Sequence, residues 1–200
     1  MESDTISEIQ ALEEQILADS KRLAALKASQ PPVPVLDYEF HRTSGPVKLS
    51  ELFEGKQELI LIHNMGVCCP YCTMWADGLN GVQHHLRDRA GFVLISPDKP
   101  EIQEAFAAKR GWVFPTASAY GTTFNADMGM EIEGGAQPGM STFHRDDSGA
   151  ISRVCSESFG PYDLFCSVWH LIARLKNGEA DWEPKFSYGD KQESKSCGCA

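Results

Sequence analysis

Residues 58–72 read ELILIHNMGVCCPYC, an apolar run that leads directly into a CxxC pair. The four consecutive branched residues from Leu59 to Ile62 are typical of a strand buried on both faces. Pro70 suits the first position of a helix, because an N–H group there would have no helical partner. The stretch therefore predicts a central strand followed by a helix that begins just after Cys69.

The flanking residues predict an α/β fold with a central mixed sheet covered by helices. Crossover helices make the first two strands parallel, and a C-terminal hairpin adds antiparallel strands. The expected helices are 4–28, 49–53, 70–87, 100–110 with Gly111 as its C-cap, and 161–175. The expected strands are an edge strand within 33–40, then 58–63, 91–96, 140–144 and 151–155.

The N-terminal helix carries a narrow apolar stripe. Ile9, Leu12, Ile16, Leu23 and Leu26 recur at spacings of three, four and seven residues. Two interpretations stay open. The helix packs on its own domain, or it pairs with a second copy of the chain through a coiled-coil-like seam, which would make a homodimer.

Composition excludes several classes of partner. The formal net charge is -10, which argues against nucleic acid and against an anionic membrane surface. No apolar stretch approaches the length of a membrane-spanning helix. The N-terminus shows no secretory signal, and seven cysteines do not suggest a secreted disulfide framework. We therefore expect a cytoplasmic protein whose cysteines carry redox or metal chemistry.

Cys69 and Cys72 are the candidate catalytic residues. Cys69 would be the N-cap of the helix, where free backbone N–H groups and the helix dipole stabilise its thiolate. Cys72 lies three residues later on the same face, within reach of that sulfur. This predicts a nucleophilic Cys69 and a sheltered, resolving Cys72. Asp77, further along the helix, is either a buried proton acceptor or, in the interpretation that we favour, a solvated acid. Cys68 is expected to end the strand.

Pro138 is the third candidate site residue. In thioredoxin-like proteins a cis-proline precedes the first strand of the C-terminal hairpin and faces the CxxC motif. Pro138 stands just before the strand expected at 140–144, so we expect a cis peptide bond there, with Pro138 holding the substrate backbone near the sulfurs.

The sequence resembles the thioredoxin-like family called domain of unknown function 899, whose members are predicted dithiol-disulfide oxidoreductases. The resemblance spans most of residues 8–182. Its motifs are Cys69-Pro70-x-Cys72 with Trp75-Ala76-Asp77 and Asn80-Gly81, Gly111-Trp112-x-Phe114-Pro115, Phe124-Asn125-x-Asp127, and Pro138-Gly139-x-Ser141-x-Phe143-x-Arg145. It implies a thioredoxin-like fold and an enzyme that reduces or exchanges disulfides of a protein or small molecule, without a bound cofactor or metal.

Other interpretations of the cysteines remain. The glutaredoxin motif is also Cys-Pro-Tyr-Cys, but Ala136-Gln137-Pro138 replaces the usual Thr-Val-Pro of that family. A peroxiredoxin needs a Thr three residues before its reactive cysteine, and Gly66 stands three residues before Cys69. The alternative from another class is a soft-metal-binding or redox-sensor module that uses the same cysteines.

The chain divides into an N-terminal helix at 1–30, a thioredoxin-like domain at 31–183 and a flexible tail at 184–200. The tail ends in Cys197-Gly198-Cys199. A tethered pair of thiols sees a site on the same chain at roughly millimolar effective concentration. Two interpretations stay open: Cys197 and Cys199 are incidental cysteines of a solvated tail, or they are accessory redox residues that exchange electrons with Cys69 and Cys72.

Overall fold

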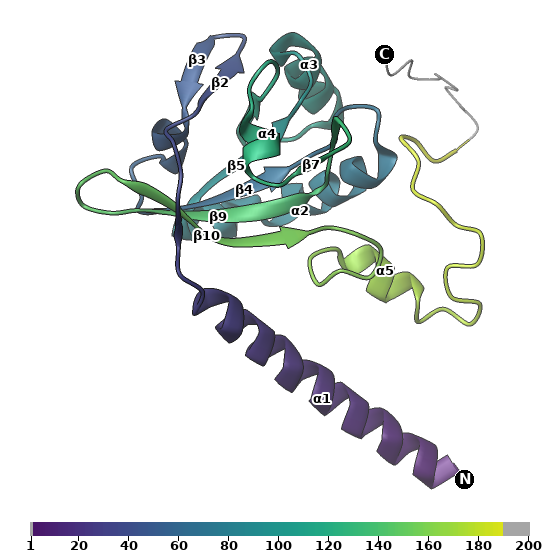
Figure 1. Ribbon diagram of the computed structural model, residues 1–200. Helices are drawn as coiled ribbons and strands as arrows, with labels where there is room; N and C mark the ends of the chain where they lie inside the picture. The colour runs from purple at the N-terminus through teal and green to yellow at the C-terminus, as the bar shows by residue number, and fades with distance from the viewer. Residues whose placement is uncertain (1, 190–200) are drawn as a thin grey trace.

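Strand β4 (Glu58–His63) lies in the centre of a mixed sheet in the computed structural model, which describes residues 2–189 (Figure 1). It pairs in parallel with β5 (Gly91–Ser96) and antiparallel with β9 (Gly139–Arg145). The sheet order is β1-β10-β9-β4-β5-β6-β2-β3. The outer strands are β1 (Val33–Pro34), β2 (Glu39–Arg42), β3 (Gly45–Lys48), β6 (Thr116–Ser118) and β10 (Ile151–Ser158).

Helices cover both faces of this sheet. They are the 3-10 helix η1 (Leu49–Phe53), α2 (Pro70–Arg89), α3 (Pro100–Arg110), α4 (Phe124–Asp127) and α5 (Ser167–Ile172). The N-terminal helix α1 (Glu2–Ala28) projects away from the sheet (Figure 1). A separate small hairpin joins β7 (Glu131–Ile132) and β8 (Gly135–Ala136). The α/β fold with a mixed sheet and an extra N-terminal helix is therefore confirmed.

Strand β4 contributes to two hydrophobic clusters because alternate side chains point to opposite faces. Leu59 and Leu61 pack with η1 and with Phe124 of α4. Ile62 packs on the other face with Trp75 and Ala76 of α2 and with Trp169 of α5. This two-sided burial accounts for the continuous apolar sequence of the strand. It also holds the start of α2 at the carboxyl end of β4.

The predicted elements differ from the structure at both ends of the domain. In place of the single edge strand predicted within 33–40, the chain forms two short strands, β1 and β2. They lie toward opposite edges of the sheet. The helix predicted over 161–175 is reduced to α5, because Asp163 organises the preceding turn. Its carboxylate accepts hydrogen bonds from the backbone N–H groups of Gly160, Phe165 and Cys166. Trp169 is the buried side chain of α5.

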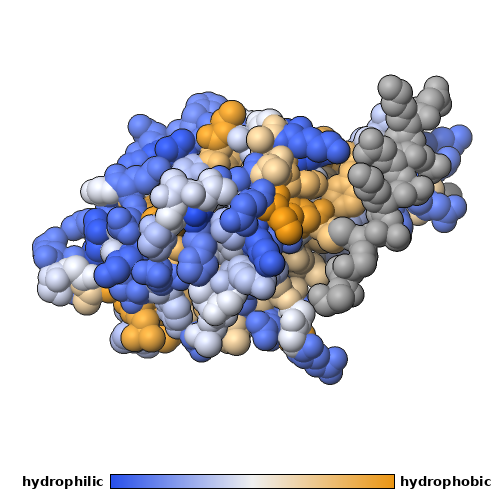
Figure 2. Space-filling view, turned by 90° about the horizontal axis from the view of Figure 1, so that it is seen from above, coloured by the Kyte–Doolittle hydropathy of each residue, from blue (hydrophilic) through white to orange (hydrophobic). Residues whose placement is uncertain are grey.

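The two ends of the chain sit differently on the domain. The side chains of α1 are almost all exposed, so the predicted packing of this helix on its own domain is not found. Residues 184–189, which the sequence assigns to the tail, contact the domain instead: Arg110 donates to the carbonyl of Phe186, and Pro184 is buried. None of the helices in residues 2–189 is long and apolar enough to cross a bilayer. Figure 2 shows a largely hydrophilic face with small apolar patches.

Gly91, the first residue of β5, allows η1 to approach the sheet closely. A Cβ atom at this position would lie 2.6 Å from the carbonyl oxygen of Leu52 and 2.9 Å from Cα of Phe53. Both are backbone atoms that cannot rotate away, so η1 would have to move.

We predict that Gly91→Ala lowers the free energy of unfolding by about 1–3 kcal/mol, the usual cost of overpacking. Urea unfolding followed by circular dichroism measures this. The control is Gly81→Ala in α2, where nothing lies within 4 Å of the added methyl group. It should raise stability by up to ~1 kcal/mol, because alanine favours helix. Equal effects of the two substitutions would contradict the close approach of η1.

Candidate functional site

The loop between β4 and α2 presents the cysteine pair at the carboxyl end of the central strands. Cys69 is the N-cap of α2 and Pro70 is its first residue, as the sequence predicts. Strand β4 ends at His63, so Cys68 lies in the loop and the expectation that it ends the strand is wrong. Strand β4 ends before Cys68 because Asn64 turns the chain: its side-chain oxygen accepts the N–H of Gly66 at 2.8 Å.

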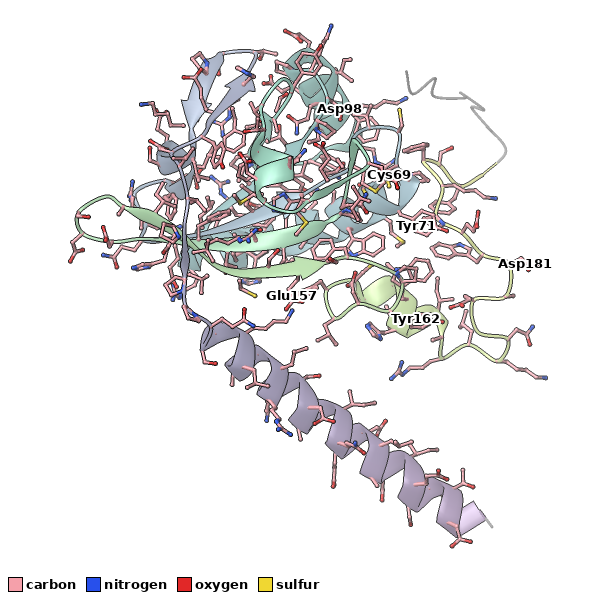
Figure 3. All side chains as sticks on the ribbon, in the orientation of Figure 1. Cys69, Tyr71, Asp98, Glu157, Tyr162 and Asp181 are labelled. Carbon is pink, nitrogen blue, oxygen red and sulfur yellow. The ribbon has the colours of Figure 1, made fainter. Side chains whose placement is uncertain are left out.

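Asp98, which follows β5, anchors this loop. Its carboxylate accepts the backbone N–H of Val67 at 3.0 Å and the hydroxyl of Ser96 at 2.8 Å. Gly66 has φ of 111°, and a Cβ there would lie 3.0 Å from both carboxylate oxygens of Asp98. Figure 3 shows Asp98 and Cys69 in neighbouring loops on this side of the sheet. Sequence reasoning missed Asp98, although its place after a strand parallel to β4 was a usable signal.

Cys69 and Cys72 are brought together by the first turn of α2. The backbone N–H of Cys72 donates to Sγ of Cys69 at 3.1 Å. The hydroxyl and the N–H of Thr73 both donate to the carbonyl of Cys69, at 2.9 and 3.0 Å, which fixes the N-cap residue. Cys69 is half-buried and Cys72 is only 4% exposed. One thiol is therefore accessible and the other is sheltered, as predicted.

The two thiols have opposite electrostatic environments. The Cys72 thiol and the backbone N–H groups of Cys72 and Tyr71 hydrogen-bond to Cys69, and against an opposing desolvation they lower its pKa to about 7. The same hydrogen bond to Cys69, together with burial and the negative charge of Cys69, raises the pKa of Cys72 far above its ordinary value. At pH 7 about half of Cys69 is thus thiolate, a much larger share than for an ordinary cysteine, beside a protonated Cys72.

Aromatic side chains pack between the cysteine motif and α5 (Figure 3). Tyr71 stacks on Trp169, with ring centroids 6.0 Å apart, and Trp169 also contacts Trp75, Tyr162 and Trp182. The indole N–H of Trp75 donates to Asp163 at 2.8 Å, which joins α2 to the turn before α5. Tyr71, which stands between the two cysteines in the sequence, is thereby packed against α5.

Pro138 lies at the same edge of the sheet. It precedes β9, whose first residue Gly139 pairs with His63 at the end of β4. No peptide bond within residues 2–189 is cis, so the expectation of a cis bond at Pro138 is wrong. The backbone on both sides is held in extended hydrogen bonds: Gln137 N–H donates to Met130, and the Pro138 carbonyl accepts from Phe159. This segment enters β9 as a continuing strand, which a trans bond allows.

Two further candidates have structural roles. Asp77 forms an ion pair with Arg110 and accepts the indole N–H of Trp112 at 2.8 Å, so it is neither a solvated acid nor a proton acceptor under Cys72. His63 is buried, and its Nε2 lies 2.9 Å from the Ser141 hydroxyl. Burial and the positive charge of Arg153 lower the pKa of His63 to about 3, so it is neutral at physiological pH.

The remaining sulfur ligands do not form a metal centre within the described chain. Between residues 2 and 189 no group of three His, Cys, Asp or Glu side chains is arranged to hold a metal ion. Cys155 lies on β10 and Cys166 before α5, and burial raises the pKa of both thiols. The accessory candidates Cys197 and Cys199 lie outside the described residues.

Comparison with known protein families shows which family the chain belongs to. The model of the family "Bacterial protein of unknown function (DUF899)" matches residues 5–191. The chain belongs to this family. The family resemblance expected from the CxxC, Trp112 and Pro138 motifs is thereby confirmed. A search among proteins of curated function finds no match.

Solved structures similar to this DUF899 chain share its thioredoxin-like fold. Peroxidoxin BcpB from Mycobacterium tuberculosis is 25% identical, with a TM-score of 0.52 over 64% of this chain and 84% of that one. Reduced Prx3 from Vibrio vulnificus is 13% identical, with a TM-score of 0.55 over 72% of this chain and 97% of that one. The fold expected from the sequence is thus confirmed.

The lowered pKa of Cys69 predicts a specific pH profile for alkylation by iodoacetamide, which reacts with thiolates. The rate at Cys69 should rise with pH and reach half of its maximum near pH 7, because the thiolate dominates above this pKa. Cys155 and Cys166, whose pKa values are raised, should react appreciably only in more alkaline solution. Peptide mass spectrometry assigns each site. A half-maximum for Cys69 above pH 8.5 would contradict the N-cap geometry.

Proposed function

We propose that this protein is a thiol-disulfide oxidoreductase in which Cys69 attacks a substrate disulfide and Cys72 resolves the product. The observation that carries the proposal is the pair of hydrogen bonds that Cys72 directs at Sγ of Cys69, one from its backbone and one from its thiol. They stabilise the attacking thiolate and place the resolving sulfur beside it.

The first step uses the Cys69 thiolate. It displaces one sulfur of the substrate disulfide, so the substrate S–S bond breaks, a mixed disulfide forms and one substrate thiolate leaves. Cys72 then loses its proton and attacks Sγ of Cys69, which releases the second substrate thiolate. The products are a Cys69–Cys72 disulfide and a substrate dithiol, so two electrons have moved from the protein to the substrate.

The electrostatics of the pair favour this order. Cys72 holds its proton partly because of the hydrogen bond to the Cys69 thiolate and the charge of that thiolate. Formation of the mixed disulfide removes this charge and weakens this hydrogen bond. The pKa of Cys72 therefore falls when its thiolate is needed, while burial keeps Cys72 away from the incoming substrate.

Two features would place the substrate. Cys69 is the accessible sulfur, and Pro138 lies at the same sheet edge, where it would contact the substrate backbone. The substrate class is a disulfide of a protein or a small molecule, and an external dithiol must reduce Cys69–Cys72 after each turnover. A reducing compartment, which we propose to be the cytoplasm, suits this cycle.

We predict that Cys69→Ser abolishes reduction of insulin disulfides by the protein with dithiothreitol as electron donor. Cys72→Ser should lose turnover. Mixed with insulin in the absence of dithiothreitol, which would cleave the adduct, it should accumulate a mixed disulfide on Cys69, because the first step needs only the Cys69 thiolate. Intact-mass spectrometry detects that adduct. Cys166→Ser, which removes a buried thiol outside the pair, is the matched control and should retain activity. Turnover by Cys69→Ser above the dithiothreitol background would refute the assignment.

A thiol peroxidase is the second candidate, because the similar solved structures include a peroxidoxin and a reduced Prx3. In that reaction the Cys69 thiolate would attack a peroxide oxygen, form a sulfenic acid and release water or an alcohol. Within residues 2–189, the groups that hydrogen-bond to Cys69 Sγ are the Cys72 thiol and two backbone N–H groups. These groups stabilise the thiolate, but none is a hydroxyl or guanidinium that would orient a peroxide.

We therefore predict that hydrogen peroxide oxidises Cys69 no more than about tenfold faster than it oxidises a small-molecule thiol of matched pKa, compared at equal thiolate concentration. Stopped-flow fluorescence of the four tryptophans, calibrated by mass spectrometry, follows the reaction. Insulin reduction under the same conditions supplies the comparison. Oxidation of Cys69 a thousandfold faster than the reference thiol would favour the peroxidase.

A further inference from the structure

Helix α1 presents a continuous apolar surface that its own domain leaves uncovered. Its large apolar side chains are between 44% and 62% exposed: Ile6, Ile9, Leu12, Ile16, Leu17, Leu23 and Leu26. Figure 1 shows the helix projecting away from the sheet, with its N-terminus at the far end. At the near end Lys27 forms an ion pair with Glu157 of β10. This contact holds the base of the helix and leaves the apolar face open.

A long helix with an exposed apolar stripe gains stability when the stripe packs against a partner. Its 27 residues span about 40 Å at 1.5 Å per residue. Most helical stability in proteins comes from packing of an apolar face rather than from intrinsic propensity. The stripe formed by Ile9, Leu12, Ile16, Leu23 and Leu26 follows the three- and four-residue spacing of a coiled-coil seam.

The charges on α1 are segregated along its length. The first half carries the acidic residues Glu8, Glu13 and Glu14, and the second half carries the basic residues Lys21, Arg22 and Lys27. A second copy of the same helix is complementary to this pattern only when it runs in the opposite direction. A parallel copy would place like charges at the same level along the whole pair.

We infer that α1 pairs antiparallel with α1 of a second copy of this chain. In the register that sets Ile9 beside the partner's Leu26, Leu12 lies beside the partner's Leu23. In the same register Lys21, Arg22 and Lys27 are level with the partner's Glu14, Glu13 and Glu8. Arg22 and Glu13 flank the seam, whereas Lys21 and Glu14 lie on the outer face of each helix, so the attraction acts through the opposite charge of the two helix halves and is strongest at low salt.

Asp19 lowers the stability of this helix pair. It occupies the seam between Ile16 and Leu23, at the level of the partner's Ile16. A polar residue in a seam fixes register and lowers stability. The pair is therefore a reversible dimer rather than a permanent one. Because the helices run in opposite directions, the two domains lie at opposite ends of the pair, and each Cys69 faces solvent independently of the other.

Sedimentation equilibrium of the full-length chain, in reducing buffer at low salt, tests the arrangement. The unmodified protein should be a concentration-dependent dimer. E13K/E14K and K21E/R22E should each weaken dimerisation at least tenfold, since each places like charges at the same level. The fourfold variant that combines them should dimerise as the unmodified chain does, because complementarity is restored. Far-UV circular dichroism verifies that every variant folds.

A second pair of variants tests the seam itself. Leu12→Glu should abolish dimerisation, and Gln10→Glu, which adds the same charge off the stripe, should not. A chain that is monomeric at all concentrations up to about 1 mM, which corresponds to an association free energy weaker than about −4 kcal/mol, would overturn the proposal and favour docking of α1 elsewhere. A dimer insensitive to both double charge reversals would also overturn it, since a parallel pair or another interface predicts that result.

Discussion

Burial of β4 on both of its faces is the constraint on which the rest of the structure depends. Leu59 and Leu61 require a cover on one side of the sheet, and Ile62 requires a cover on the other. Helix α2 supplies the second cover, and it must begin close to the end of the strand to do so. The cysteine motif occupies this connection, so the hydrophobic effect that orders the sheet also positions the two sulfurs.

The chemistry then follows from backbone groups at the start of α2. A helix N-terminus has N–H groups without helical partners, and here one of them points at Sγ of Cys69. The nearby Cys72 thiol adds a second donor, and its hydrogen bond to Cys69, together with burial, keeps Cys72 protonated. Asp98 and Asn64 hold the preceding loop, so the cysteines are positioned by a rigid turn rather than by a mobile segment.

Much of this arrangement could be predicted from the sequence because it depends on local signals. The apolar run before Cys69, the proline at the first helical position and Gly111 at the end of α3 each act within a few residues, and the structure confirms all three. The failures involve contacts between distant residues. The turn organised by Asp163 shortens α5, and backbone hydrogen bonds from Gln137 to Met130 and from Phe159 to Pro138 fix the chain around Pro138. Neither effect leaves a periodic pattern in the sequence.

The central claim is that Cys69 and Cys72 act as one dithiol. Equilibration of the protein in dithiothreitol buffers of graded redox potential, followed by acid quenching, alkylation and peptide mass spectrometry, tests it most directly. The account predicts that both cysteines lose their alkylation together, in a single two-electron transition with a slope of about 30 mV per tenfold change in ratio. Independent loss of alkylation at Cys69, with Cys72 still alkylated at every potential, would contradict it.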